Sequence, residues 1–147
     1  MDDYIKARAG LAECLMNSNR TEEAIQKFES VKRKIELEVV FDKPILFINI
    51  CNQLGNCYLK LSQLEAAKDN FEQSLRLIAK VQETSDRVSE VIMSKIYLNL
   101  GIIATQQEDH ERAIYLHEKC IENKLAYIGE NSEEVMSSYV LLAHCYI

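Results

Sequence analysis

The segment Leu54-Gly55-Asn56-Cys57-Tyr58, followed by Ala67-Lys68-Asp69-Asn70-Phe71, decides the fold of this 147-residue chain. Its leucine and small residue return at Leu11-Ala12, Leu100-Gly101 and Leu142-Ala143. Twelve residues after the small residue comes an alanine, and four residues later a large ring, in three copies. These pairs are Ala24 with Phe28, Ala67 with Phe71, and Ala113 with His117. The chain is therefore a repeat, and repeat chains build extended binding surfaces more often than catalytic clefts.

Each repeat reads as two antiparallel helices, because small residues on both helices let the two backbones approach closely. Large residues at a helical period fill the flanking layers. On the first helices these are Leu11, Leu15, Leu54, Tyr58, Leu100, Leu142 and Tyr146, and on the second helices the rings are followed by Val31, Ser74 and Cys120. The second helices are expected to open with Asn19 before Glu22, with Ser62 before Glu65, and with Asp109 before Glu111.

The pattern Leu-Gly-x-x-Tyr followed by Ala-x-x-x-Phe resembles the tetratricopeptide repeat (TPR). The repeat steps of 43, 46 and 42 residues exceed the usual length, so about two extra helical turns are expected per unit. Such long repeats are similar to those of kinesin light chains, spindle-orienting adaptors and bacterial peptide-sensing regulators. The resemblance implies an all-α, right-handed superhelical solenoid of about three and a half repeats. It is expected to form a single TPR domain, 1–147, with units at 5–43, 44–85 and 86–130 and a first helix at 131–147, as a fragment of a longer array.

The composition of the chain limits the kinds of molecule that it is expected to bind. The chain carries 17 basic and 23 acidic residues, a formal net charge of −6, with the basic residues scattered along it. Nucleic acids and anionic membranes are therefore not expected partners. No apolar run approaches the roughly 18 residues of a membrane-spanning helix, and the start is acidic, which indicates a cytoplasmic protein, in one reading associated with the cytoskeleton. Five cysteines without a Cys-x-x-Cys pair indicate reduced thiols.

No residue pattern indicates catalysis, a cofactor or a metal site. Cys14, Cys57 and Cys145 share one place in their units with Ile103, and a place that accepts both residue types is a packing position. His117 and Cys120 have the spacing of a ligand pair, but both fall on the core side of the repeat. The chain is thus expected not to be an enzyme.

The face of the first helices that points away from the core is the expected binding surface, because a superhelix of such pairs would enclose it as a concave groove. In the second repeat this face carries Asn49, Asn52 and Asn56, whose amides can pair with any peptide backbone. Asn52 and Asn56 are expected to be exposed. In the third repeat, Leu98 and Ile102 are expected to form an apolar pocket. The remaining groove residues are Lys95, Lys6, Ala9, Glu13, Ser137, Val140 and His144. Ala9 and Glu13 stand where some family members hold a terminal-carboxylate clamp, so that clamp is not expected here.

The predicted function is a protein–protein interaction scaffold that takes an extended or helical segment of a partner in the concave groove. Two alternatives remain open at this point. One is a regulatory module that senses a short peptide, and the other is a structural component of a cytoskeletal or ciliary assembly. The last helix, which ends in Tyr146 and Ile147 and has no partner helix after it in this sequence, offers a surface for self-association.

Overall fold

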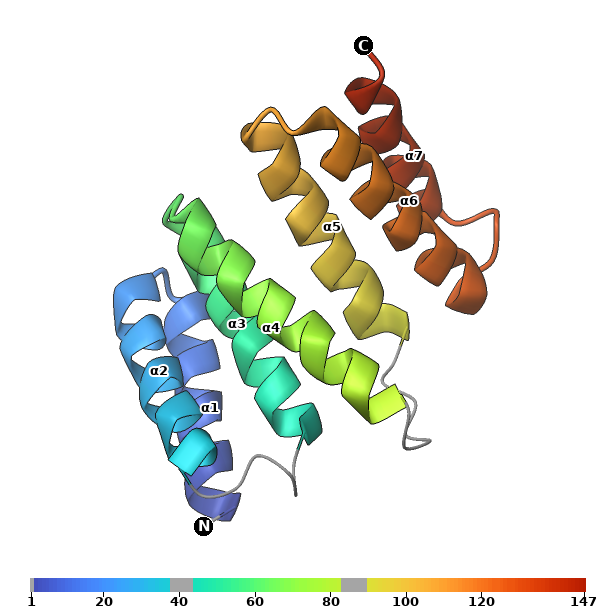
Figure 1. Ribbon diagram of the computed structural model, residues 1–147. Coiled ribbons are helices and arrows are strands. Elements are labelled where there is room, and N and C mark those ends of the chain that lie inside the picture. The colour runs from blue at the N-terminus through green and yellow to red at the C-terminus, as the bar shows by residue number, and fades with distance from the viewer. Residues whose placement is uncertain (1, 38–43, 83–89) are drawn as a thin grey trace. The chain divides into compact units, whose positions relative to one another are not determined.

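The computed structural model describes residues 2–37, 44–82 and 90–147, and within these ranges the chain forms seven α-helices and no strand (Figure 1). The helices are α1 (Asp2–Asn17), α2 (Thr21–Leu37), α3 (Pro44–Lys60), α4 (Leu64–Gln82), α5 (Glu90–Gln106), α6 (His110–Tyr127) and α7 (Glu133–Cys145). The all-α prediction is confirmed. The predicted unit boundary at 85/86 falls on residues outside the described ranges.

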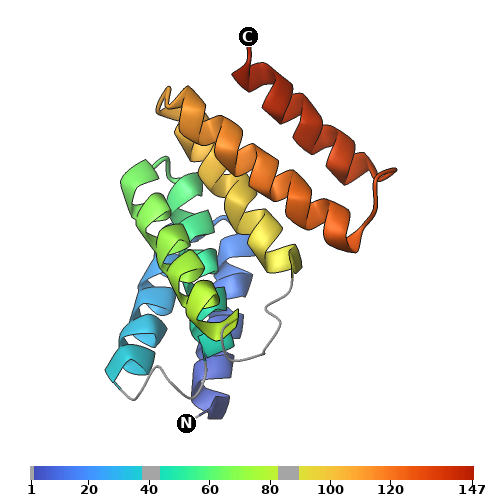
Figure 2. The same ribbon diagram turned by 45° about the vertical axis from the view of Figure 1, so that its right-hand side comes forward.

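The chain divides into two compact units, Met1–Ile78 and Ala79–Ile147. In the first, which we call unit 1, α2 packs against both α1 and α3, and the Ser74 hydroxyl on α4 donates to the Ile48 carbonyl on α3 at 3.2 Å. In the second, unit 2, α6 lies between α5 and α7 (Figures 1 and 2). Each unit therefore contains helix pairs of the expected antiparallel kind.

The close approach predicted from the small residues is the centre of each helix pair. In unit 1, a β-carbon placed on Gly55 would lie 2.6, 2.7 and 2.8 Å from three ring carbons of Phe71. In unit 2, one on Gly101 would lie 2.7 to 3.0 Å from ring atoms of His117. Both rings are buried, and Ala67 and Ala113 are fully buried beside them. Glycine is required at these two positions because the ring of the second helix occupies the space of a side chain.

Exposure at the two ends of the chain departs from the repeat pattern. Leu54 and Leu100 are buried, but the equivalent Leu11 is 50% exposed, because none of the described helices covers it. Ala143 and Tyr146 are also exposed, because none of the described helices covers them. The packing role expected for these three residues is therefore wrong.

The turns between paired helices correct the expected helix starts. Asn19, Ser62 and Glu108 all have left-handed backbone, with φ of 59°, 57° and 59°. In each turn, the amide of the next residue donates to a carbonyl five residues earlier, as Arg20 does to Leu15 at 2.9 Å. This is the Schellman arrangement that ends a helix. Asn19 and Ser62 thus terminate α1 and α3 instead of capping α2 and α4.

The true caps follow one residue later. The carbonyls of Arg20, Gln63 and Asp109 accept the first intrahelical bonds, from Ala24, Ala67 and Ala113 at 3.0, 3.0 and 2.9 Å. Asp109 is confirmed as a cap, because its side chain accepts from the Arg112 amide at 3.2 Å. The three turns share one geometry although only one of them has a side chain suited to capping.

Candidate functional site

The asparagine stripe of α3 lies in unit 1. Asn49 is exposed, whereas Asn52 and Asn56 are half-buried, so the expectation that both would be exposed is wrong. The Asn56 amide nitrogen donates to Gln53 Oε1 on the same helix at 3.4 Å, which draws that side chain along the helix surface. On α1, Lys6 and Glu13 are exposed and Ala9 is half-buried.

Asn52 carries an unsatisfied group. Its side-chain oxygen is buried and accepts no hydrogen bond from any residue in the described part of the chain. A buried polar atom without a partner costs on the order of 1–3 kcal/mol. Because this oxygen is shielded from solvent, a donor from another molecule reaches it only after the Asn52 side chain rotates outward, and such a rotation would remove that cost.

The predicted surface of unit 2 lies on α5 and α7. Lys95, Val140 and His144 are exposed, while Leu98 and Ile102 are half-buried. A cavity of about 450 Å³ opens here. It is lined by Val91, Ser94, Lys95 and Leu98 of α5, by Lys124, Tyr127 and Ile128 at the end of α6, and by Glu134 and Ser137 of α7. The structure thus joins Lys95, Leu98 and Ser137 in one cavity and leaves Ile102 outside its lining.

Lys124 was not among the site residues predicted from the sequence. Only 7% of Lys124 is exposed, and it lines one wall of this cavity. Its ammonium donates to the Glu134 carbonyl at 3.2 Å and to the Ser138 hydroxyl at 2.8 Å. A signal was present in the sequence. Lys124 follows His117 and Cys120 at helical spacing, so a charged residue stands on the core face of α6.

The cysteines divide by position. All five are free and lie within the described residues. Cys57 and Ile103 are buried as expected of a packing position, but Cys14 is exposed and Cys145 is half-buried. Burial raises the pKa of the Cys51 thiol to about 12 and raises the pKa values of Cys57 and Cys120.

These environments predict a graded thiol reactivity. In native protein, Cys14 should react first with a disulfide reagent such as Ellman's reagent, and Cys51, Cys57 and Cys120 should react slowly, because they are buried and protonated at neutral pH. After unfolding in denaturant, all five thiols should titrate. A mass lower by about two hydrogens in fresh, unreduced protein would reveal a disulfide and contradict this expectation.

His117 and Cys120 pack in the core of unit 2, as the repeat pattern predicts: their exposures are 1% and 0%. Burial lowers the pKa of His117, so its imidazole is neutral near pH 7. Its Nδ1 is buried and has no hydrogen-bond partner among the described residues. Across those residues, no three His, Cys, Asp or Glu side chains group as metal ligands do.

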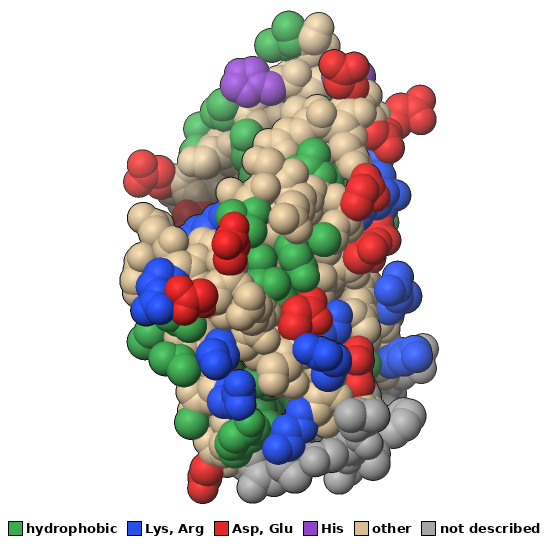
Figure 3. All heavy atoms as spheres, turned by 90° about the vertical axis from the view of Figure 1, so that its left-hand side faces the viewer, with side chains coloured by type: hydrophobic (Ala, Val, Ile, Leu, Met, Phe, Trp, Pro, Cys, Tyr) green, Lys and Arg blue, Asp and Glu red, His purple; other side chains and the backbone are tan. Residues whose placement is uncertain are grey.

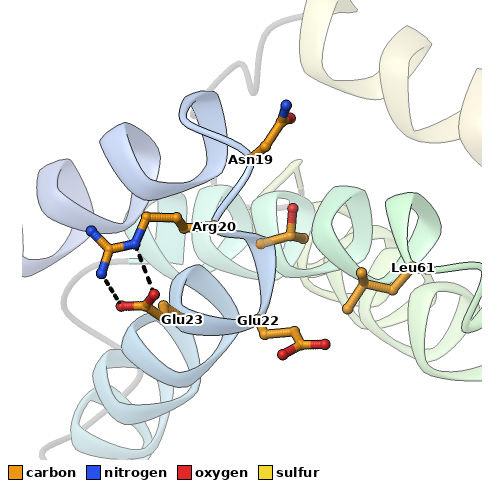
Figure 4. A pocket seen from close by; sticks show the side chains of 6 residues that line it. Asn19, Arg20, Glu22, Glu23 and Leu61 are labelled. Atoms are coloured by element: carbon orange, nitrogen blue, oxygen red, sulfur yellow. Dashed lines mark hydrogen bonds and ion pairs between the residues drawn. The ribbon is translucent and has the colours of Figure 1, made fainter.

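A second hollow, of about 310 Å³, lies at the turn between α1 and α2 in unit 1 (Figure 4). Asn19, Arg20, Thr21, Glu22 and Glu23 line it together with Leu61. The Arg20 guanidinium is engaged by Glu23 through two hydrogen bonds of 2.6 and 2.7 Å. Its charge is therefore already neutralised, and the hollow lacks a free cation for an anionic ligand.

The surface charge is mixed. On the face seen in Figure 3, acidic and basic side chains occur next to one another. Within residues 2–37, 44–82 and 90–147, none of the helices combines the length and the apolar character needed to cross a bilayer.

Comparison with known proteins shows which repeat and which fold this chain resembles. Residues 48–80, which cover most of α3 and α4, match the tetratricopeptide repeat family model. The fold is similar to that of BtubC (BKLC) from P. vanneervenii, with 23% identity and a TM-score of 0.77 over 97% of this chain and 54% of that one. It is also similar to the nearly identical TPR-like repeats of a Podosopora anserina protein that carries the name kinesin light chain, with 17% identity and a TM-score of 0.76 over 99% and 67% of the two chains. None of the curated proteins matches this sequence.

The chain therefore has an all-α fold similar to that of TPR-like repeat proteins, and residues 48–80 carry a match to the tetratricopeptide repeat itself. It spans about half the length of the BtubC chain. TPR folds typically act as non-catalytic platforms on which other proteins bind, because stacked helix pairs present an extended concave surface.

Proposed function

We propose that this chain is a non-enzymatic scaffold that binds an extended or helical segment of a partner protein in the concave groove lined by its first helices. The observation that carries the proposal is the stripe of three side-chain amides along α3, in which Asn49 is exposed and Asn52 and Asn56 are half-buried. Side-chain amides both donate and accept, so such a stripe can pair with a peptide backbone whatever its sequence.

Unit 2 supports the same function. Its cavity combines the apolar side chain of Leu98 with the charged Lys95, and Val140 and His144 are exposed on α7. Binding pockets for small groups are typically apolar with a few polar side chains that fix orientation. Within each unit, the first helices therefore carry surface suited to a peptide.

We also propose a cytoplasmic location and partners that are proteins. Free thiols are typical of reducing compartments, and all five cysteines are free. A net charge of −6 with interspersed signs does not favour nucleic acid. The peptide-sensing and cytoskeletal or ciliary alternatives stay predictions, to be separated by the identity of the partner.

Self-association through α7 is a further part of the proposal. The stretch Val135–Ile147 contains no acidic residue, lysine or arginine, and Met136, Tyr139, Val140 and Ile147 are exposed on it. A second copy could cover this face without opposing like charges. Light scattering across a concentration series should then show a dimer that Met136→Glu weakens, and an invariant monomer in both proteins would contradict this part.

Truncating the amides tests the scaffold. Asn52→Ala combined with Asn56→Ala should weaken binding of a partner isolated by affinity capture and mass spectrometry by about tenfold to thirtyfold, because each lost hydrogen bond contributes about 1 kcal/mol. Stability should stay the same or rise by about 1 kcal/mol, because Asn52→Ala removes an unsatisfied buried oxygen and Asn56 is half-buried. Calorimetry measures the affinity and thermal melts the stability. Asn17→Ala, an exposed change on α1, is the matched control.

A companion variant, Leu98→Asp, should weaken binding more, because it replaces an apolar contact with a carboxylate that must lose its hydration when the partner binds. If the double mutant binds as wild type does while Leu98→Asp unfolds the chain, the asparagines do not contribute to binding and Leu98 belongs to the core. The groove mechanism would then be replaced by contact through the second helices.

A further inference from the structure

Lys124 carries a buried positive charge without a matching negative one. Its ammonium contacts two neutral oxygens, the Glu134 carbonyl and the Ser138 hydroxyl. Within the described part of the chain, no carboxylate lies at ion-pair distance from it. Cys120 does not compensate either, because burial raises the pKa of its thiol and keeps it protonated. Buried charges in proteins are ordinarily paired.

The ammonium also has donor capacity to spare. A lysine ammonium has three N–H groups, and the two hydrogen bonds of Lys124 use two of them. Lys124 lines the cavity of unit 2 beside the exposed Lys95, and Glu134 is the acidic residue in the same lining. Two lysines against one glutamate give this cavity a net positive charge, in a chain whose overall charge is −6.

A second polar group in the cavity, the Tyr127 hydroxyl, can accept a hydrogen bond from a ligand. The Ser94 hydroxyl donates to the Val91 carbonyl at 2.9 Å, so its hydrogen is already used. The Tyr127 hydroxyl, 3.0 Å away, must then donate to Ser94. This leaves the Tyr127 oxygen with a free lone pair and no hydrogen to give, so it can accept an N–H from a ligand.

We propose that the cavity of unit 2 binds a carboxylate on a short aliphatic stem next to a peptide N–H, which is the chemistry of an acidic residue or of a chain terminus. Lys124 and Lys95 bind the carboxylate, Leu98 and Val91 contact the stem, and Tyr127 accepts the N–H. A volume of about 450 Å³ fits one residue with its adjoining backbone. The inference rests on the proposed function, because it names the group of the partner that unit 2 recognises.

Small peptide mimics test this on the whole chain without a partner. Nuclear magnetic resonance titrations would use N-acetylglutamate N-methylamide, the neutral N-acetylglutamine N-methylamide, and N-acetylleucine with a free carboxylate. The glutamate probe should shift signals of cavity residues, and the glutamine probe should bind at least about tenfold more weakly, since bonds to charged groups are the stronger ones. Stronger binding of acetylleucine than of the glutamate probe would assign the ligand to a chain terminus. Equal binding of the glutamate and glutamine probes, or no shift with either acid, would overturn the proposal.

Substitutions in and outside the cavity test whether the probe binds there. Lys124→Met should weaken binding of the acidic probe at least about tenfold. Lys119→Met should leave it unchanged, because that lysine lies on the same helix but pairs with Glu122 at 2.8 Å and does not line the cavity. If Lys124→Met lowers the melting temperature too far for titration, Ser137→Leu fills the cavity from an exposed position and should abolish the shifts. Full binding by whichever of the two variants stays folded would overturn the assignment.

The outcome is separable from that of the proposed function. The asparagine variants change unit 1 and are measured with a protein partner, whereas the probes report on unit 2 alone. A failed titration with partner binding still sensitive to Asn52 and Asn56 would reject the carboxylate site and leave the scaffold standing.

Discussion

Gly55→Leu should lower the free energy of unfolding by about 3 kcal/mol, and Gly101→Leu should have a similar effect. A β-carbon at either position would lie 2.6 to 3.0 Å from the ring of Phe71 or His117. Because these rings are buried between helices, relief requires the paired helices to separate. Denaturant titrations followed by far-ultraviolet circular dichroism measure the change.

A matched glycine gives the control. Gly10 lies inside α1, is exposed, and would have no atom within 4 Å of an added β-carbon. Gly10→Ala should therefore stabilise the chain by about 0.5–1 kcal/mol, because alanine is favoured over glycine inside helices. Unchanged denaturant midpoints for both leucine variants would show that the helices do not meet at these glycines.

His117→Phe should stabilise the chain and reduce the dependence of its stability on pH. Burial lowers the pKa of His117 below its ordinary value of 6.5. As the pH falls below 6.5, the unfolded chain takes up a proton that the folded chain does not, so stability is lost by up to about 1.4 kcal/mol per pH unit until the folded pKa is reached. We expect the variant to gain about 1 kcal/mol at pH 7.5, from removal of the unpaired Nδ1, and a larger amount at pH 5.5, because the wild type loses stability there and the variant does not.

The reciprocal substitution is the control. Phe71 packs against Gly55 in unit 1 as His117 packs against Gly101 in unit 2. Phe71→His should therefore lower stability and make its dependence on pH steeper between 6.5 and 5. Parallel stability curves for wild type and His117→Phe across this range would mean that His117 accepts a proton in the folded chain.

The close helix contacts could be predicted because they depend on spacing along the sequence alone. Gly55 and Phe71 sit at positions that the repeat fixes, and so do Gly101 and His117. The turn residues were misread because Asn19 and Ser62 suit both the end of one helix and the start of the next. Their left-handed backbone, shared with Glu108, shows that the first use prevails.

Exposure and charge pairing depend on neighbours that no local pattern contains. Leu11 and Cys14 repeat the residue types of Leu54 and Cys57, yet they are exposed because none of the described helices packs over them. The cavity of unit 2 required three helices to bring Lys124, Leu98 and Ser137 together. From the sequence, only the presence of a lysine on the core face of α6 could have indicated it.

The shared turn geometry makes the helix hairpin a transferable module. Asn19, Ser62 and Glu108 differ in size and charge, yet the chain leaves each first helix and enters the next in the same way. The path is set by backbone hydrogen bonds, so exchanging one turn sequence for another should preserve the angle between its helices. When such hairpins are duplicated, the connecting residues can therefore change independently in each copy. The faces that carry Asn52 and Lys124 would still keep the same orientation toward the core of their own helix pair.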